Sequence, residues 1–325
     1  MDLARETVNA DYAYQKGYFG EGIGVAIVDT GIYSHPDLIQ GGKRIVCFKD
    51  LINLKTSMYD DCGHGTHVAG IIGGNGYASG GRYMGIAPKC NIIAIKALNY
   101  KGDGNISEVL VALKWILEHK EEYNIRILNL SFGTGTKEPN KEGVKLIHAV
   151  EKVWDSGIVV VVAAGNGGPN PNTIAVPGSS KKVITVGASD DNVEVNLMGS
   201  KAKNYSGRGP TFECIKKPDI VAPASNIMSC NLIRGFGNDP LRGFPRKRGN
   251  GKSTRDTVNG HYVEKSGTSM STPIVSGAVA LLLSAKPELT PKEVKIKFRE
   301  SAQDLGASQS KQGWGLLNIK SLLEA

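Results

Sequence analysis

The 325-residue sequence predicts a three-layer α/β fold, in which a predominantly parallel central sheet carries helices on both faces. Short runs rich in Val and Ile, bounded by Gly, Asn or Asp, alternate with amphipathic stretches of helical period. Continuous apolar runs of this length are typical of strands that are covered on both faces. We expect these strands at residues 25–28, 91–96, 126–130, 158–163 and 183–186.

Two helices are predicted between these strands. Apolar side chains of residues 106–121 fall on one stripe at helical spacing, and Asn105 with Glu108 predicts a capping box at its start. The second helix is expected over residues 142–155, where Gly157 would end it.

Two more helices are predicted near the end of the chain. One begins near Ser269 and ends before Pro287. The other starts at Thr290, which is followed by Pro291 in the first turn and by Glu293 at the third helical position. Strands and helices therefore alternate along the whole chain.

The composition is that of a globular protein, with 22% charged and 40% hydrophobic residues. No apolar stretch approaches the length needed to cross a membrane, and the N-terminal residues do not predict a signal peptide. The five cysteines lack paired close spacing and predict free thiols rather than disulfides or a zinc site. These features favour a cytoplasmic location, and the alternative is a secreted mature form from which a leader has been removed.

Positive charge is concentrated in one Gly-rich segment. The net charge is +8, and residues 231–262 hold seven basic residues against two acidic ones. We expect a single domain over residues 1–325 with a basic insertion at about 231–262. A solvated loop is the expected role of this insertion, since no recognition-helix pattern accompanies the charge, and an acidic partner or nucleic acid is the alternative.

Three separate motifs supply a carboxylate, an imidazole and a hydroxyl. Asp29 follows a predicted strand, His64 lies in a Gly-rich segment, and Ser269 opens a predicted helix. A serine is a poor nucleophile unless an imidazole takes its proton and a carboxylate orients that imidazole. Taken alone, Asp29 would be a turn residue or helix cap, so the prediction of a catalytic triad depends on the agreement of the three motifs.

The neighbours of these residues exclude other sites. His64 and His67 are three residues apart, whereas zinc metalloproteases use two His four apart with a Glu after the first. We therefore expect His64 to act as the base and His67 to be packed or hydrogen-bonded. Ser271 stands where the nucleophile elbow of an α/β-hydrolase needs Gly. The sequence also predicts a strand that leads into Asn166, whose amide could stabilise an oxyanion or simply form a turn.

Over roughly residues 10–320 the chain resembles the subtilisin-like serine proteases (subtilases), and most closely the intracellular AprX-like bacterial branch. This resemblance implies an endopeptidase in which Ser269 is the nucleophile, His64 the general base, Asp29 its orienting carboxylate and Asn166 the oxyanion-hole amide. It further implies binding of protein or peptide substrates by main-chain pairing, broad specificity with a preference for large apolar P1 residues, and no cofactor for the chemistry. The implied substrate-binding residues are Gly102, Asp103, Gly104, Ser131, Phe132, Gly133, Ala163, Ala164 and Gly165.

The chain departs from the family pattern at two places. The loop over residues 73–81 contains no carboxylate, so a tight calcium site is not expected there, whereas a weak calcium or sodium site near residues 170–175 is possible on carbonyl oxygens. The metal ligands are not predicted. Family members usually carry an inhibitory N-terminal prosegment, and none is evident in this sequence.

Three other functions fit single features of the chain. A pseudoprotease would bind a partner through an intact cleft, and a nucleic-acid-binding protein would use the basic segment. A sedolisin-type acid peptidase shares a similar serine motif but requires Glu where this chain has His64. The combined motifs favour the serine endopeptidase.

Overall fold

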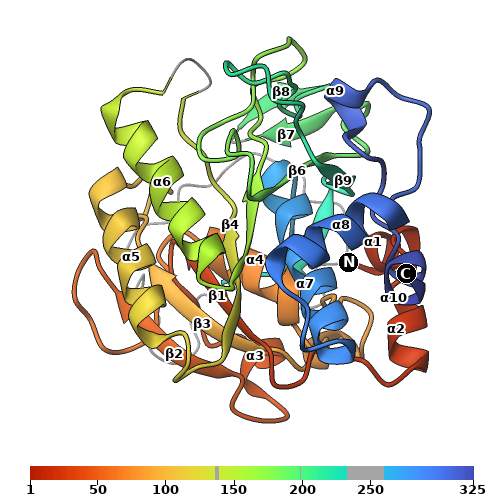
Figure 1. The fold of residues 1–325 in the computed structure, drawn as a ribbon. Helices are drawn as coiled ribbons and strands as arrows, with labels where there is room; N and C mark the ends of the chain where they lie inside the picture. The colour runs from red at the N-terminus through yellow and green to blue at the C-terminus, as the bar shows by residue number, and fades with distance from the viewer. Residues whose placement is uncertain (136–138, 198, 233–259) are drawn as a thin grey trace.

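The computed structural model describes residues 1–325 except 136–138, 198 and 233–259 (Figure 1). Most of the basic insertion predicted at 231–262 therefore lies outside the described residues. The centre of the molecule is a seven-stranded parallel sheet in the order β2-β3-β1-β4-β5-β6-β9. Its strands are β1 (Gly24–Asp29), β2 (Ile45–Asp50), β3 (Asn91–Lys96), β4 (Ile125–Leu130), β5 (Val159–Ala163), β6 (Ile184–Ala188) and β9 (Ile220–Ala222).

All five predicted strands are present, with ends that differ by no more than two residues. All five are buried along most or all of their length, as continuous runs of Val, Ile and Leu predict. Strands β2 and β9 were not predicted. β2 is an edge strand in which four of the six residues are partly exposed, and β9 has only three residues.

Strand β1 is the point at which the strand order reverses, because β2 and β3 lie on one side of it and β4 to β9 on the other. It pairs with β3 on one side, from Gly24 with Asn91 to Asp29 with Lys96, and with β4 on the other. In an open parallel sheet, ligands bind outside the carboxyl ends of the strands at such a switch point. Asp29 lies at this position.

Helices cover both faces of the sheet, which confirms the predicted layers. α5 (Ile106–His119) and α6 (Lys141–Asp155) pack against each other and over one face, and they are seen side by side in Figure 1. α4 (His64–Gly73) and α7 (Thr268–Ala285) pack together on the other face, and α7 contacts β4, β5 and β6.

Helix α7 is a core helix. It is the one helix of the described residues that is long and apolar enough to span a membrane, with a mean hydropathy of 1.4, and 83% of it is buried in the protein. The prediction that no apolar stretch reaches this length was wrong for residues 268–285. Burial of the Leu, Ile and Val side chains of α7 is worth roughly 1.5–3 kcal/mol each.

The helix ends follow the sequence signals with one exception. α8 (Pro291–Ser301) begins after Thr290 as predicted, with a capping box in which Thr290 Oγ1 accepts from the N–H of Glu293 and Glu293 accepts from the N–H of Thr290. The capping box predicted at the start of α5 was wrong. Asn105 donates its side-chain amide to Glu108 Oε1 at 3.1 Å and accepts no bond from the helix.

Short elements complete the fold. The N- and C-terminal helices lie close together (Figure 1), and the N–H of Ile319 donates to the carbonyl of Val8. The remaining elements are α1 (Asp2–Thr7), α2 (Asp11–Gln15), α3 (Pro36–Ile39), η1 (Tyr77–Ser79), β7 (Val195–Leu197), β8 (Ser200–Ala202), β10 (Ile227–Cys230), β11 (Tyr262–Lys265), α9 (Gln309–Gln312) and α10 (Ile319–Glu324).

Candidate active site

The predicted site residues gather at the carboxyl edge of four adjacent strands. Asp29 is the last residue of β1, and the predicted substrate segments 102–104 and 131–133 follow the two strands on either side of it, β3 and β4. Residues 163–166 end β5 and follow it, next to β4. The parallel sheet thus brings together segments that are far apart in the sequence.

Asp29 and His64 are joined by a hydrogen bond. His64 Nδ1 lies 2.8 Å from Asp29 Oδ1, which also accepts the N–H of Thr30 at 2.8 Å. The carboxylate is buried, whereas the His64 side chain is 24% exposed. A carboxylate can only accept, so it holds the proton on Nδ1 and leaves Nε2 free to take a proton from another group.

Gly65 permits this close approach of α4 to β1. A Cβ atom at residue 65 would collide with the carbonyl oxygen of Gly31 and would lie 3.2 Å from Asp29 Oδ1. The N–H of Gly65 also donates to Thr30 Oγ1 at 2.9 Å. The glycine after His64 is therefore required by backbone packing.

Asp60 holds the segment that carries His64, a role that the sequence analysis missed. One carboxylate oxygen accepts from the N–H groups of Cys62 and Gly63, and the other accepts from the N–H and hydroxyl of Thr66. Burial alone would raise the pKa of Asp60, but these hydrogen bonds outweigh it and hold the pKa below its ordinary value. An acidic residue just before a helix N-terminus was the available signal.

Lys96 was also missed. This lysine, the last residue of β3, is fully buried. Its ammonium donates to the carbonyl oxygens of Thr30 and Leu98 at 2.6 and 2.9 Å, and to Asp61 Oδ1 at 2.7 Å. One buried cation therefore joins the end of β1 to the segment before His64.

Ser269 is the second residue of α7 and is partly exposed. Two residues just before Ser269 contact the other site segments. Lys265 Nζ donates to the carbonyl of Gly63 at 3.2 Å, and the N–H of Thr268 donates to Asn166 Oδ1 at 2.9 Å. No hydrogen bond of Ser269 Oγ to His64 is present among the described residues. Such bonds often tighten only in the complex with substrate.

Asn166 presents a free donor beside Ser269. Its Oδ1 accepts from both the N–H and the hydroxyl of Thr268, at 2.9 and 3.0 Å, so the amide is held by its oxygen. Asn166 is exposed, and its Nδ2 group remains available. The N–H of Ser269 lies in the first turn of α7, where the helix provides no carbonyl partner. Two N–H donors therefore flank the serine.

Two of the predicted substrate-binding glycines, Gly133 and Gly165, face a common neighbour. A Cβ atom at Gly133 would lie 2.7 Å from the Cβ of Ala175, and one at Gly165 would lie 2.8 Å from it. Only glycine therefore fits at both positions. Ser131, in contrast, is buried and accepts from Asn129 Nδ2 at 2.9 Å, so its side chain serves the fold.

Comparison with known proteins agrees with this geometry. The family model described as the subtilase family matches residues 20–315. The chain belongs to the subtilase family.

Relatives within the family include proteases from Bacillus. The chain is 43% identical to Serine protease AprX of Bacillus subtilis over 91% of its own length, 32% identical to Minor extracellular protease Epr of the same species over 97%, and 31% identical to subtilisin DY of Bacillus licheniformis over 97%. It spans 65% of the length of AprX, 41% of Epr and 95% of subtilisin DY. The predicted resemblance to subtilases, and to AprX among them, is confirmed.

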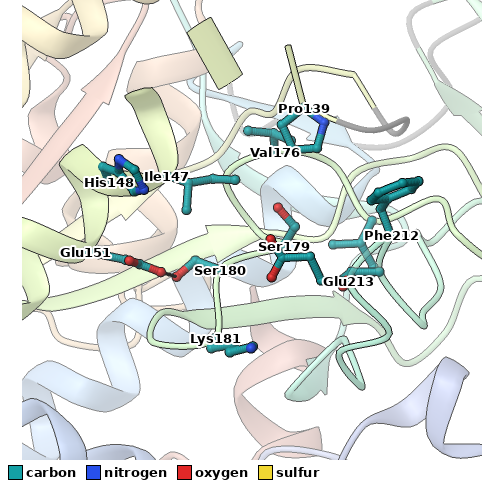
Figure 2. A pocket seen from close by; sticks show the side chains of 12 residues that line it. Pro139, Ile147, His148, Glu151, Val176, Ser179, Ser180, Lys181, Phe212 and Glu213 are labelled. Atoms are coloured by element: carbon teal, nitrogen blue, oxygen red, sulfur yellow. Dashed lines mark hydrogen bonds between the residues drawn. The ribbon is translucent and has the colours of Figure 1, made fainter. Parts of the chain in front are cut away.

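One segment of this subtilase contacts the predicted substrate-binding residues and also borders a separate cavity. Ile174 and Val176 line a cavity of about 190 Å³, whereas Ala175 between them contacts Gly133 and Gly165. Figure 2 shows Val176, Ser179 and Phe212 around this cavity.

The loop over residues 73–81 does not fit a tight calcium site in this subtilase. A buried guanidinium, that of Arg44, donates to the carbonyls of Gly73 and Asp37 beside the loop. The Asp37 carboxylate is already used, because it accepts from the N–H of Ala78 and the hydroxyl of Tyr262 at 2.9 and 2.8 Å. A cation in that position would meet positive charge and too few free oxygens.

His35, Asp37 and Cys230 form a buried group with metal-ligand chemistry. Two members have a role without a metal: His35 Nδ1 accepts the N–H of Asp37 at 3.1 Å, and the Asp37 carboxylate is bound as described above. Burial raises the pKa of the Cys230 thiol well above its ordinary value, which opposes the thiolate that a metal requires. The group therefore fits a structural cluster better than a metal centre.

Proposed function

We propose that the protein is a serine endopeptidase that acts through Asp29, His64 and Ser269. The observation that supports this most directly is the 2.8 Å contact between Asp29 Oδ1 and His64 Nδ1 at the end of β1. The contact of Lys265 Nζ with the carbonyl of Gly63 joins the segment of His64 to that of Ser269. The buried carboxylate orients the ring, and the exposed side of the ring is open to substrate. All relatives named above are proteases.

In the proposed reaction, Ser269 Oγ attacks the peptide carbonyl while His64 Nε2 takes the hydroxyl proton. The negative charge on the carbonyl oxygen is stabilised by Asn166 Nδ2 and the N–H of Ser269. His64 then gives its proton to the leaving amine, and an acyl-enzyme on Ser269 remains. A water molecule activated by the same imidazole releases the second product.

Substrate is proposed to bind as an extended strand between residues 102–104 and 131–133, which follow the strands on either side of β1. The P1 side chain would enter between Gly133 and Gly165, towards Ala175, with Ala163 and Ala164 on one wall. Because these wall residues are small, we propose broad specificity with a preference for large apolar P1 residues. An inhibitory prosegment would bind in the same cleft.

The chemistry of a subtilase requires no cofactor. A weak calcium or sodium site on carbonyl oxygens near residues 170–175 remains a proposal. The five cysteines are free in the structure, and the proposed cytoplasmic location rests on them.

Covalent labelling tests the proposed function. A fluorophosphonate probe should label the protein on Ser269, and digestion of a denatured protein mixture should give cut sites after large apolar residues. Ser269→Ala should abolish labelling and cleavage, whereas Ser107→Ala at an exposed position should change neither. If the folded protein is not labelled by the probe and cuts no peptide, that result would favour the pseudoprotease, which binds a partner through its cleft.

A further inference from the structure

A second cavity lies at the opposite edge of the sheet from the catalytic residues. It measures about 550 Å³ and is bordered by the C-terminal end of α6, the residues before β6 and one side of α8. These are the amino ends of strands β5 and β6, whereas Asp29 lies at a carboxyl end. The proposed endopeptidase activity does not use this cavity.

The floor of the cavity is apolar. Trp154, which is 8% exposed, and Trp314 line it together with Pro291. Ile296, on α8, also lines it and is 43% exposed. An apolar side chain of a ligand could be buried here, and burial of a large one is worth roughly 1.5–3 kcal/mol.

Lys295 fixes α8 over this floor. Its ammonium donates to the carbonyls of Lys181, Lys182 and Val183 at 2.9, 3.0 and 2.8 Å. It lies 6.0 Å from the ring centroid of Trp154 and 5.9 Å from that of Trp314. The floor is therefore built from fixed groups before any ligand arrives.

The rim of the cavity is basic. Lys181, Lys292 and Arg299 line it, and none of the three forms an ion pair with a carboxylate in the part of the chain that the structure describes. Asp155 is the only acidic residue among those that line the cavity, and it pairs with Lys182 at 2.7 Å. Three cations thus remain available to a negatively charged ligand.

The arrangement of the cations favours a peptide over a phosphate compound. The start of α8 disfavours phosphate, because Pro291 has no N–H, the N–H of Glu293 donates to Thr290 Oγ1, and Glu293 brings a carboxylate to the same end. Lys292 and Arg299 are seven residues apart on one side of α8, which separates them by roughly 10 Å along the helix axis. Side chains on one face of an extended peptide repeat every roughly 7 Å, so its carboxylates can reach both ends of the row.

We propose that this cavity is an exosite that binds an acidic peptide segment carrying one bulky apolar side chain. The apolar side chain enters between Trp154, Trp314 and Ile296, and flanking carboxylates meet Lys181, Lys292 and Arg299. A protein substrate with such a segment is held at one edge of the molecule while another part of it reaches the catalytic edge.

The test measures binding with no catalysis. Fluorescence anisotropy follows a labelled Glu-Glu-Leu-Glu-Glu peptide added to the Ser269→Ala variant of the 325-residue chain at physiological ionic strength. The double variant Lys292→Glu with Arg299→Glu should weaken binding by about tenfold or more. The control, Lys43→Glu with Lys145→Glu, makes the same change in net charge at exposed positions outside the cavity and should leave binding within about twofold. Thermal melts verify that both variants are folded.

The peptide itself provides a second control. Replacing its Leu by Ala should weaken binding several-fold, since the apolar floor then loses its ligand. Equal weakening by the two double variants would mean general charge attraction and would overturn the proposal. So would tighter binding of inorganic tripolyphosphate than of the peptide, or no binding at all. Because the variant is inactive by design, failure of the proposed endopeptidase activity would not alter these outcomes.

Discussion

Asn166 uses the two ends of its side-chain amide differently. The oxygen accepts twice from Thr268 and fixes the side chain, while the nitrogen remains available on the exposed side. A donor that is fixed before the reaction stabilises developing negative charge without the cost of reorganisation. In the proposed mechanism this residue therefore affects the transition state more than the bound substrate.

Replacing Asn166 by Ala should lower kcat by about 10²–10³ and change KM little, a magnitude taken from subtilisin, a member of the same family. Steady-state kinetics on a peptide substrate measures both constants. Asn170→Ala, in the following exposed loop, is the matched control and should leave kcat unchanged. A large rise in KM with an unchanged kcat would assign Asn166 to substrate binding instead.

At the scale of elements, the sequence predicted strands that are buried on both faces and helices with a clear apolar stripe. It did not predict β2, where residues such as Lys49 interrupt the apolar pattern because the strand lies at the sheet edge. It also did not predict β9, whose three residues are too short for a periodic pattern. The Asn105 cap was wrong because a side-chain contact with Glu108 replaced the expected backbone contact.

The candidate site was predicted unevenly for a related reason. Asp29, His64 and Ser269 each lie in a recognisable local motif, so the sequence suggests them. Lys96 reads as the polar end of an apolar strand, and its role depends on Asp61 and on the carbonyl of Thr30, which are distant in the sequence. The register of β1 with β3 and the position of the segment before α4 bring these groups together.

Lys96 joins β3 to the end of β1 and to the segment before α4, so its replacement should lower both stability and activity. Lys96→Met keeps the length of the side chain but leaves Asp61 and two carbonyls without their partner. Loss of one member of a buried pair costs about 3–5 kcal/mol, and because the Asp61 side chain is 20% exposed we expect the lower end of this range. The displaced His64 segment should also lower kcat. Urea unfolding and peptide hydrolysis measure the two effects.

Lys89→Met is the control for this change. Lys89 pairs with Glu21 at 2.8 Å, but both side chains are more than half exposed, so the loss should stay below about 1 kcal/mol. Similar destabilisation by the two variants would show that the buried contacts of Lys96 contribute no more than a surface pair.

At the scale of the whole molecule, the segments that carry the proposed catalytic residues His64 and Ser269 are joined through buried packing on one face of the sheet. His67, fully buried in α4, lies 3.1 Å through its Nε2 from the carbonyl oxygens of Ile227 in β10 and Val263 in β11. Nε2 therefore carries the proton and donates, and no partner of Nδ1 is found among the described residues. The neutral ring holds the helix of His64 to the two-stranded sheet of β10 and β11, whose second strand precedes α7.

This arrangement makes stability depend on pH. Burial, with the nearby charges of Lys265 and His64, lowers the pKa of His67 well below its ordinary value of 6.5. Below that pH the unfolded chain binds a proton that the native state does not bind, so the free energy of unfolding should fall as pH decreases, by at most about 1.4 kcal/mol per pH unit for this residue. The carboxylate of Asp60 has a lowered pKa and adds a similar loss only below its ordinary value of 3.8.

Urea unfolding at a series of pH values between neutrality and about pH 5 should therefore show a stability that decreases with acidity. His67→Gln retains an N–H donor for the two carbonyls and removes the titrating group, so its stability should fall less steeply over the same range. His148→Gln, at an exposed position, should retain the slope of the parent protein. Parallel curves for the parent and His67→Gln would show that protonation of His67 does not limit stability in acid, and the buried His35, whose pKa burial also lowers, would then be the next residue to replace.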